Sequence, residues 1–306
     1  MSVELVTIAS AGVTASFRPS VGCELVALTE TRSAVQLLAR SPWGLRSSDE
    51  VSWFGSSEEF WMQRTAGGWS VQFPHAGAPS DHEGVIQPFH GEAGTVTWEI
   101  VDHDSDRAHF RTRLMRSPVE LDRFVRVEDT TLVIRDVARN LSTETLQVSW
   151  GYHPTFGAPF LAAGLHIEID ADEFVIGREP TGVPTSALAG TWPFLGKVDL
   201  SILPDRAQPR ALLAYLRARS GHYRLTNRGL GVRVEVRWPI EMLPNIWLWQ
   251  ELEGSSGYPW FGRAYVMGVE PQSMGAQREE PSITILGGES RSVEIAAEIS
   301  YPAAAD

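Results

Sequence analysis

The chain has 306 residues, of which 38 are acidic and 26 are basic, so its formal net charge at pH 7 is −12. Because a surface of this sign repels phosphate groups, nucleic acids and anionic membranes are poor candidate partners. Hydrophobic residues make up 43% of the chain and charged residues 21%. This composition is typical of a globular protein and excludes a disordered or fibrous one.

Cys23 is the only cysteine, so no intrachain disulfide can form, as is usual in a reducing compartment. Residues 1–17 lack the basic start and apolar run of a signal peptide, and no stretch approaches the ~20 apolar residues of a membrane-spanning helix. We therefore expect a cytoplasmic protein. No linker, repeat or low-complexity tract divides the chain, which indicates a single domain over residues 1–306, in a monomer or a homodimer.

Alternating and β-branched residues, interrupted by Gly, Pro, Asn and Asp, recur from end to end and predict many short strands. In chain order the predicted strands are residues 3–9, 12–17, 94–101, 107–114, 121–127, 130–137, 145–150, 165–169, 222–226, 231–238, 246–252, 264–269, 282–286 and 292–299. In the stretch 231–238, Val232, Val234 and Val236 alternate with charged residues. A sheet with one buried face produces this pattern.

Only residues 209–219 are predicted to form a helix, because Leu212, Leu213 and Leu216 fall roughly on one side. Residues 177–204, which are rich in Gly, Pro, Ser and Thr, are predicted to form a long connecting loop within the domain. Many strands with one or two short helices predict an all-β fold, a large antiparallel β-sandwich.

A first candidate segment, residues 87–94, places His90 directly before Gly91 and just ahead of a predicted strand. Gly91 and Gly94 permit a tight turn or a close backbone approach to a ligand, so His90 would lie at the mouth of a cavity. The alternative is a turn histidine that makes a structural hydrogen bond.

A second segment, residues 150–157, places His153 directly before Pro154. The proline forces extended geometry on His153 and is expected to end the strand, so that the histidine leaves the sheet edge among aromatic residues. A histidine in such surroundings could titrate near neutral pH and donate a proton. The alternative is a packed, neutral histidine.

A third segment places Glu270 at the end of an apolar strand, directly before Pro271. Burial beside Val269 and Met267 would raise the pKa of Glu270 toward the range that suits a general base. The alternative is a carboxylate that caps a turn by accepting hydrogen bonds from backbone N–H groups.

Together the three segments resemble the aldose 1-epimerase (galactose mutarotase) family. That family has an early histidine followed by Gly, a later His-Pro-x-Phe at a strand end and a Gly-x-Glu-Pro strand near the C-terminus. The matching motifs here, in the same order and at similar separations, are residues 90–91, 153–156 and 268–271. An Asn-containing turn at 139–142 and a Gly-Gly-Glu turn at 287–289 extend the likeness over residues 10–300. The resemblance implies a large β-sandwich with a sugar site on a concave sheet.

Carried over to this chain, the resemblance implies Glu270 as general base, His153 as general acid and His90 as a second histidine near the sugar ring oxygen. Opening a cyclic hemiacetal requires removal of the C1 hydroxyl proton and protonation of the ring oxygen. A carboxylate and an imidazolium on opposite sides of the breaking bond can perform both transfers. The resemblance thus implies an isomerase that interconverts the α and β anomers of a free aldose, with no metal and no cofactor.

The family's early Asn-Arg element is not clearly present, and a Gly-Gly-Trp then Phe-Pro-x-x-Gly pattern, which resembles divergent bacterial members, stands in its place. By this resemblance Arg64 is expected to bind a sugar hydroxyl, and Trp69 and His75 are expected to lie at the rim of the site. The family's sugar-binding aspartate has no clear match, and Asp199 is the candidate for it.

Two alternatives to a free-aldose epimerase stay open. A hexose-phosphate mutarotase would need several cations that converge on the phosphate. Arg64, Arg178 and Arg263 could contribute, although they form no local cluster in the sequence. The other alternative is a non-catalytic protein that binds or senses a sugar on the same fold, since a fold does not fix a function.

A metal site is not expected. His75, Asp81, His82 and His90 lie close together in the sequence, but their spacing matches no familiar set of metal ligands.

Overall fold

The computed structural model describes residues 3–47, 55–82, 84–183, 185–276 and 283–301. The strands in these ranges are β1 (Val6–Ala9), β2 (Val13–Arg18), β3 (Glu24–Glu30), β4 (Val35–Gln36), β5 (Trp69–Gln72), β6 (Ser80–His82), β7 (Val85–Gln87), β8 (Glu99–His103), β9 (Arg107–Arg113), β10 (Val119–Glu128), β11 (Thr131–Asn140), β12 (Leu146–Val148), β13 (Gly151–Gly157), β14 (His166–Thr181), β15 (Ala189–Thr191), β16 (Phe194–Leu195), β17 (Val198–Asp199), β18 (Arg210–Asn227), β19 (Val232–Arg237), β20 (Asn245–Leu252), β21 (Tyr265–Gln272), β22 (Ile283–Ile285) and β23 (Ser290–Ser300). Within the described ranges, 19 strands join in one continuous network, beside two small two-stranded sheets.

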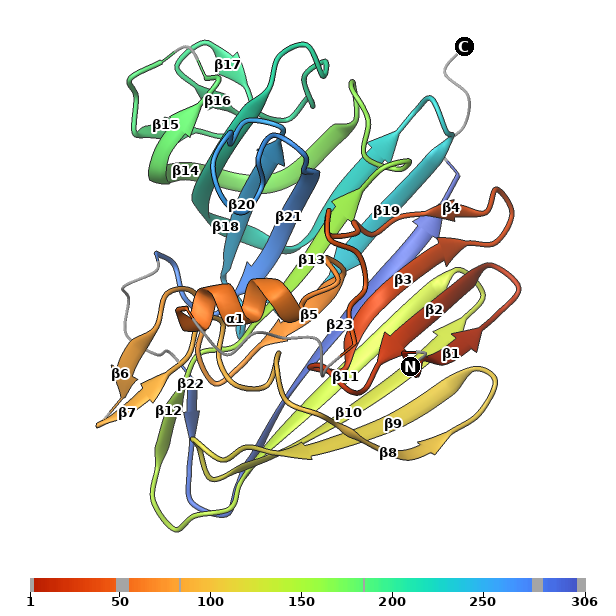
Figure 1. Cartoon of the computed structure of the whole chain (residues 1–306), viewed down its shortest axis with the longest axis vertical. Helices are drawn as coiled ribbons and strands as arrows, with labels where there is room; N and C mark the ends of the chain where they lie inside the picture. The colour runs from red at the N-terminus through yellow and green to blue at the C-terminus, as the bar shows by residue number, and fades with distance from the viewer. Residues whose placement is uncertain (1–2, 48–54, 83, 184, 277–282, 302–306) are drawn as a thin grey trace.

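The network folds into two layers that share the long strand β18 (Figure 1). The N-terminal half of β18 pairs with β20, and the first layer continues through β21, β13, β5, β3 and β2 to β1. The C-terminal half pairs with β19, and the second layer continues through β23, β11, β10 and β9 to β8. β14 runs along the other edge of β18. These pairings are antiparallel, so the predicted all-β sandwich is confirmed.

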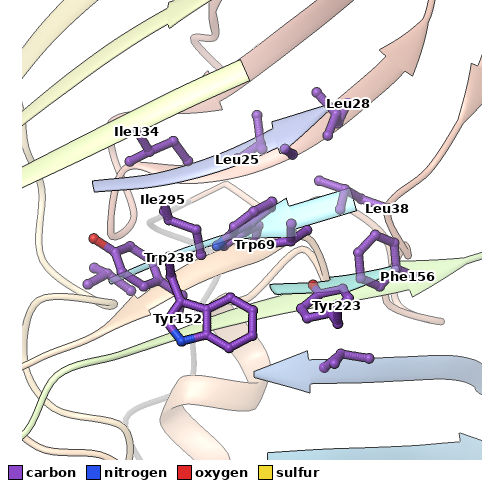
Figure 2. Packing of buried hydrophobic residues seen from close by; sticks show 14 of the residues in the cluster. Leu25, Leu28, Leu38, Trp69, Ile134, Tyr152, Phe156, Tyr223, Trp238 and Ile295 are labelled. Carbon is purple, nitrogen blue, oxygen red and sulfur yellow. The ribbon is translucent and has the colours of Figure 1, made fainter. Parts of the chain in front are cut away.

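The hydrophobic core lies between the two layers. Leu25, Trp69 and Tyr152 of the first layer and Ile134 and Ile295 of the second belong to one buried cluster (Figure 2). Burying each such side chain contributes roughly 1.5–3 kcal/mol, which is the main source of stability for a fold of this kind. The core therefore fixes which face of each central strand is left for other contacts.

One α-helix, α1 (Ser57–Arg64), lies within the described residues. It begins with a capping box, in which the Ser56 side chain accepts from the backbone N–H of Glu59 while the Glu59 carboxylate accepts from that of Ser56. Trp61 is its buried residue. No helix in the described part of the chain is long and apolar enough to cross a membrane.

Predictions of local structure are wrong in three places outside the candidate site. Residues 94–101 are not one strand, because β8 begins only at Glu99. Residues 209–219 are not a helix, and residues 210–219 belong to β18. Nearly all of the first nine residues of β18 are buried, so its leucines do not alternate with polar residues, and such a strand is easily mistaken for a helix. Residues 177–204 are not one loop, because β14 continues to Thr181 and β15, β16 and β17 follow; residue 184 lies outside the described residues.

Candidate active site

The hydrogen-bonded ladder between β13 and β21 opens at its middle. On either side of the opening the paired residues are Gly151 with Gln272 and Thr155 with Gly268. Each unpaired stretch contains a proline, Pro154 on one strand and Pro271 on the other, and a proline has no N–H to donate to a ladder. Because the register is the same on both sides of the opening, His153 and Glu270 lie directly opposite each other within it.

The prediction that His153 leaves the sheet at an edge is wrong. Pro154 was expected to end the strand and leave the histidine at a sheet edge, but β13 continues to Gly157. β13 lies between β5 and β21, so His153 occupies the middle of the first layer. Pro154 interrupts the pairing of β13 with β21 only. The pairing of β13 with β5 includes both His153 and Pro154.

His153 and Glu270 belong to a row of side chains that crosses four strands. The register places Ser70 of β5 beside His153 and Trp247 of β20 beside Glu270. Trp249 lies two residues further along β20, on the same face. All five residues line one cavity of about 260 Å³. This volume is below the roughly 300 Å³ at which sites for drug-sized ligands begin, so the cavity suits one small ring.

Aromatic side chains from outside the sheet form much of the remaining cavity wall. Trp61 comes from α1, Phe89 from the segment that follows β7, and Tyr258 and Trp260 from the segment between β20 and β21. The Trp249 and Trp260 ring centroids are 5.5 Å apart. Aromatic faces are suitable surfaces for the apolar C–H faces of a ligand whose edges are polar.

The His153 and Glu270 side chains are in direct contact and almost fully buried. His153 Nε2 lies 3.4 Å from Glu270 Oε1, and the exposed fractions of the two residues are 7% and 2%. Burial raises the pKa of Glu270 well above its ordinary value and lowers the pKa of His153 to about 4. Burial thus favours the neutral form of each group, whereas their contact favours the ion pair. In either form the carboxyl group and the imidazole share one titratable proton, so the pair presents one proton donor and one acceptor.

The ring of His153 is oriented by its own strand. Its Nδ1 lies 2.8 Å from the hydroxyl oxygen of Thr155, two residues further along β13 and on the same face. This contact occupies one ring nitrogen and leaves Nε2 toward Glu270.

His90 approaches the same cavity from a turn. The backbone of His90 has φ of 60° and that of Gly91 has φ of 78°, and a Cβ on Gly91 would lie 2.4 Å from the carbonyl oxygen of Phe73. Nδ1 of His90 accepts a hydrogen bond from the backbone N–H of Gly77 at 3.1 Å, so the proton of the neutral ring is on Nε2. Burial, with the nearby histidines, lowers the pKa of His90. The ring is therefore a neutral N–H donor, and its centroid is 5.4 Å from that of His153.

The turn that follows α1 also lines the cavity, and Glu24 holds it in place. The Glu24 carboxylate accepts from the Thr65 hydroxyl at 2.9 Å and from the backbone N–H groups of Ala66 and Gly68 at 3.0 and 3.2 Å. Arg18 pairs with the same carboxylate at 2.7 Å, and Arg18 and Glu24 are each 1% exposed. A buried ion pair thus fixes one wall of the cavity.

Of the predicted site residues, the structure brings His90, His153 and Glu270 together around the cavity. Trp69 does not lie at its rim. Successive residues of a strand point to opposite faces, so Ser70 faces the cavity and Trp69 packs in the core.

Arg64, His75 and Asp199 do not line the cavity either. The Arg64 guanidinium lies 5.3 Å from the centroid of the Phe60 ring, at the end of α1. His75 is buried, with Nε2 2.5 Å from the carbonyl oxygen of Ala78. Asp199 accepts from the backbone N–H and the hydroxyl of Ser201, which ties it to its own turn.

Two exposed cations also line the cavity. Arg40 and Arg178 both line the cavity and are exposed, and neither forms an ion pair with a carboxylate in the described part of the chain. Arg178 was named with Arg64 and Arg263 as a possible contributor to a phosphate site, and nothing in the sequence marked Arg40. The helix that carries Trp61 was missed, although the Ser56 and Glu59 capping box is a sequence signal for a helix start.

No group of three or more His, Cys, Asp or Glu side chains within the described ranges could hold a metal ion. Of the histidines that are close in sequence, His90 already accepts a hydrogen bond at Nδ1 and His75 contacts a carbonyl oxygen at Nε2.

Neither a protein-family model nor a curated protein matches the chain. Solved structures do. The Slr1438 protein from Synechocystis sp. PCC 6803 has a TM-score of 0.75 at 16% identity, with 99% of this chain and 97% of that chain covered. The GalM/aldose epimerase homologue from C. elegans has a TM-score of 0.69 at 18% identity, with 98% and 99% covered. A galactose mutarotase-like protein from Clostridium acetobutylicum has a TM-score of 0.68 at 16% identity, with 97% and 95% covered. Over nearly its whole length, the chain therefore has the galactose mutarotase-like fold.

Proposed function

We propose that this protein is an aldose 1-epimerase that interconverts the α and β anomers of a small free aldose. The observation that carries the proposal is the buried contact of 3.4 Å between His153 Nε2 and Glu270 Oε1 at the wall of a ring-sized cavity. A neutral N–H donor, His90, lines the same cavity. The structural relatives named for aldose epimerase or galactose mutarotase point in the same direction.

The proposed reaction consists of paired proton transfers. With the pair in its charged form, Glu270 removes the proton of the C1 hydroxyl while His153 gives its proton to the ring oxygen. The bond between C1 and the ring oxygen breaks as the C1 carbonyl forms, which yields the open-chain aldehyde. Rotation about the C1–C2 bond presents the other face of the carbonyl. The two transfers then run in reverse and close the ring as the other anomer.

His90 has a separate part in this scheme. Since Nε2 carries the proton of the neutral ring, it can donate a hydrogen bond to a sugar oxygen without giving up the proton. The donor stabilises negative charge that develops on that oxygen as the ring opens.

Arg40 and Arg178 favour a second candidate, a mutarotase for an aldose that carries a phosphate. Both guanidinium groups are exposed, line the cavity and form no ion pair in the part of the chain that the structure describes. Two arginines can bind a phosphate through charge-assisted, bidentate hydrogen bonds. Arg64 and Arg263 do not line the cavity.

Exchange NMR of anomeric protons tests the proposal with a panel of free aldoses and their 6-phosphates, using Glu270→Gln as the control. We expect saturation transfer between the α and β signals with the unmodified protein and none above the spontaneous rate with the variant. The best substrate decides between the two candidates. Binding of a sugar without faster exchange for any member of the panel would refute both and favour a sugar-binding protein.

A further inference from the structure

Two buried glutamines lie behind the His153–Glu270 row. The register places Gln72 of β5 and Gln272 of β21 on either side of Gly151 in β13, and both glutamines are fully buried. They lie two residues from Ser70 and Glu270 along their strands, so they share the face that lines the cavity. Neither side chain lines the cavity itself.

The two amides form a chain of hydrogen bonds that ends on the proposed reacting groups. Gln272 donates through Nε2 to the side-chain oxygen of Gln72. Gln72 Nε2 lies 2.9 Å from His90 Nδ1 and 3.4 Å from Glu270 Oε2. Gln272 Nε2 lies 3.5 Å from the same carboxylate oxygen. The two Nε2 atoms have two N–H groups each, so one orientation of both amides can supply a donor for all four contacts.

Gly151 makes this arrangement possible. A Cβ on Gly151 would lie 1.8 Å from Oε1 and 2.5 Å from Nε2 of Gln272. Only glycine leaves room for the Gln272 side chain to cross the strand and reach Gln72.

We propose that Gln72 and Gln272 are positioning residues that hold the Glu270 carboxylate and the His90 ring in the geometry for proton transfer. This inference rests on the proposed function. The amides bind Oε2, so Oε1 is the oxygen left toward His153 and the cavity. The N–H group of Gln72 directed at His90 Nδ1 acts with Gly77 to keep the proton of that ring on Nε2.

The chemistry of the pair explains why these positions carry amides. Oε1 of Gln272 is buried and has no hydrogen-bond partner among the described residues, which is a cost that an apolar side chain would avoid. N–H donors to Oε2 stabilise the ionised carboxylate and oppose the effect of burial on the pKa of Glu270. An apolar pair would pack but would leave the carboxylate without these donors.

The variants Gln72→Met and Gln272→Met remove the amides at similar side-chain length, and Gly151→Ala displaces Gln272. Gln250→Met is the matched control, because Gln250 is a fully buried glutamine on β20 that contacts Met267 and does not line the cavity. We expect the acid limb of the pH–rate profile to move up by roughly one pH unit in either glutamine variant, since each loses a hydrogen bond to a charged group. We expect kcat to fall about 10-fold with KM nearly unchanged, and the double variant to be less than additive. Gln250→Met should leave the profile in place.

A readout without turnover separates this inference from the proposed function. Carbon-13 NMR of protein labelled at the glutamate carboxyl carbons, assigned with Glu270→Gln, follows the titration of Glu270 in the absence of sugar. Nitrogen-15 shifts of His90 report its tautomer. If the Glu270 midpoint rises in both glutamine variants but no sugar is turned over, the inference holds and the epimerase proposal fails. If the midpoint and the His90 tautomer are unchanged in both variants, the inference is overturned whatever the activity.

Discussion

Replacing Glu24 by glutamine should destabilise the protein strongly, although the side chain keeps its size. The carboxylate accepts four hydrogen bonds, from the Arg18 guanidinium, the Thr65 hydroxyl and the backbone N–H groups of Ala66 and Gly68. Removing its charge leaves the Arg18 cation buried without a counter-charge, for which about 3–5 kcal/mol is typical. The NH₂ group of the new amide would also face the N–H and O–H groups that donate to the carboxylate in the wild type.

Urea unfolding followed by tryptophan fluorescence measures the loss, and Glu294→Gln is the control. Glu294 faces Arg126 across 3.8 Å, and both side chains are about half exposed, at 52% and 53%. An exposed pair of this kind contributes only about 0.2–1 kcal/mol. We expect Glu24→Gln to lower the free energy of unfolding by about 3 kcal/mol or more and the control by less than about 1 kcal/mol. Equal, small losses in the two variants would refute the argument from burial.

Three further outcomes follow from the site. His153→Asn should slow anomer exchange by roughly 10²–10⁴-fold, the range for one positioned proton donor; near-normal exchange by NMR would remove His153 from the mechanism. Because burial raises the pKa of Glu270 in the folded state, the free energy of unfolding of the wild type falls as the pH rises above the unfolded pKa of about 4.3. Glu270→Gln has no such carboxyl group, so its stability relative to the wild type should increase as the pH rises above about 4. Thermal unfolding at a series of pH values measures this difference, and a difference independent of pH would contradict the assignment. Trp249→Ala should weaken sugar binding by about 0.5–1.5 kcal/mol in calorimetry, and unchanged affinity would exclude stacking on this ring.

Much of the fold could be predicted from local patterns. The alternation of Val232, Val234 and Val236 predicted a strand with one buried face, and β19 has this form. The first nine residues of β18 could not be assigned in the same way, because both faces are largely buried and the polar half of the pattern is missing. The sequence signal for α1 was present, but it consists of only two residues, Ser56 and Glu59.

The residues of the candidate site could likewise be predicted only in part. His90, His153 and Glu270 were singled out because each stands beside a glycine or proline that marks an irregular point in a strand or turn. Trp69 was assigned to the rim by resemblance, and the phase of β5 places it in the core instead. A shift of one residue moves a side chain to the opposite face, and no local pattern fixed that phase for so short a strand.

The sequence by itself determined the local conformations: where the chain turns at Gly91, and where Pro154 and Pro271 cannot donate to a ladder. Only the tertiary structure decided that these points meet. β5, β13 and β21 are far apart in the sequence, and their register alone sets His153 opposite Glu270 and Gln72 beside Gln272 across Gly151. Such long-range register is selected by the burial of both layers together, a property of the whole chain that no short segment carries.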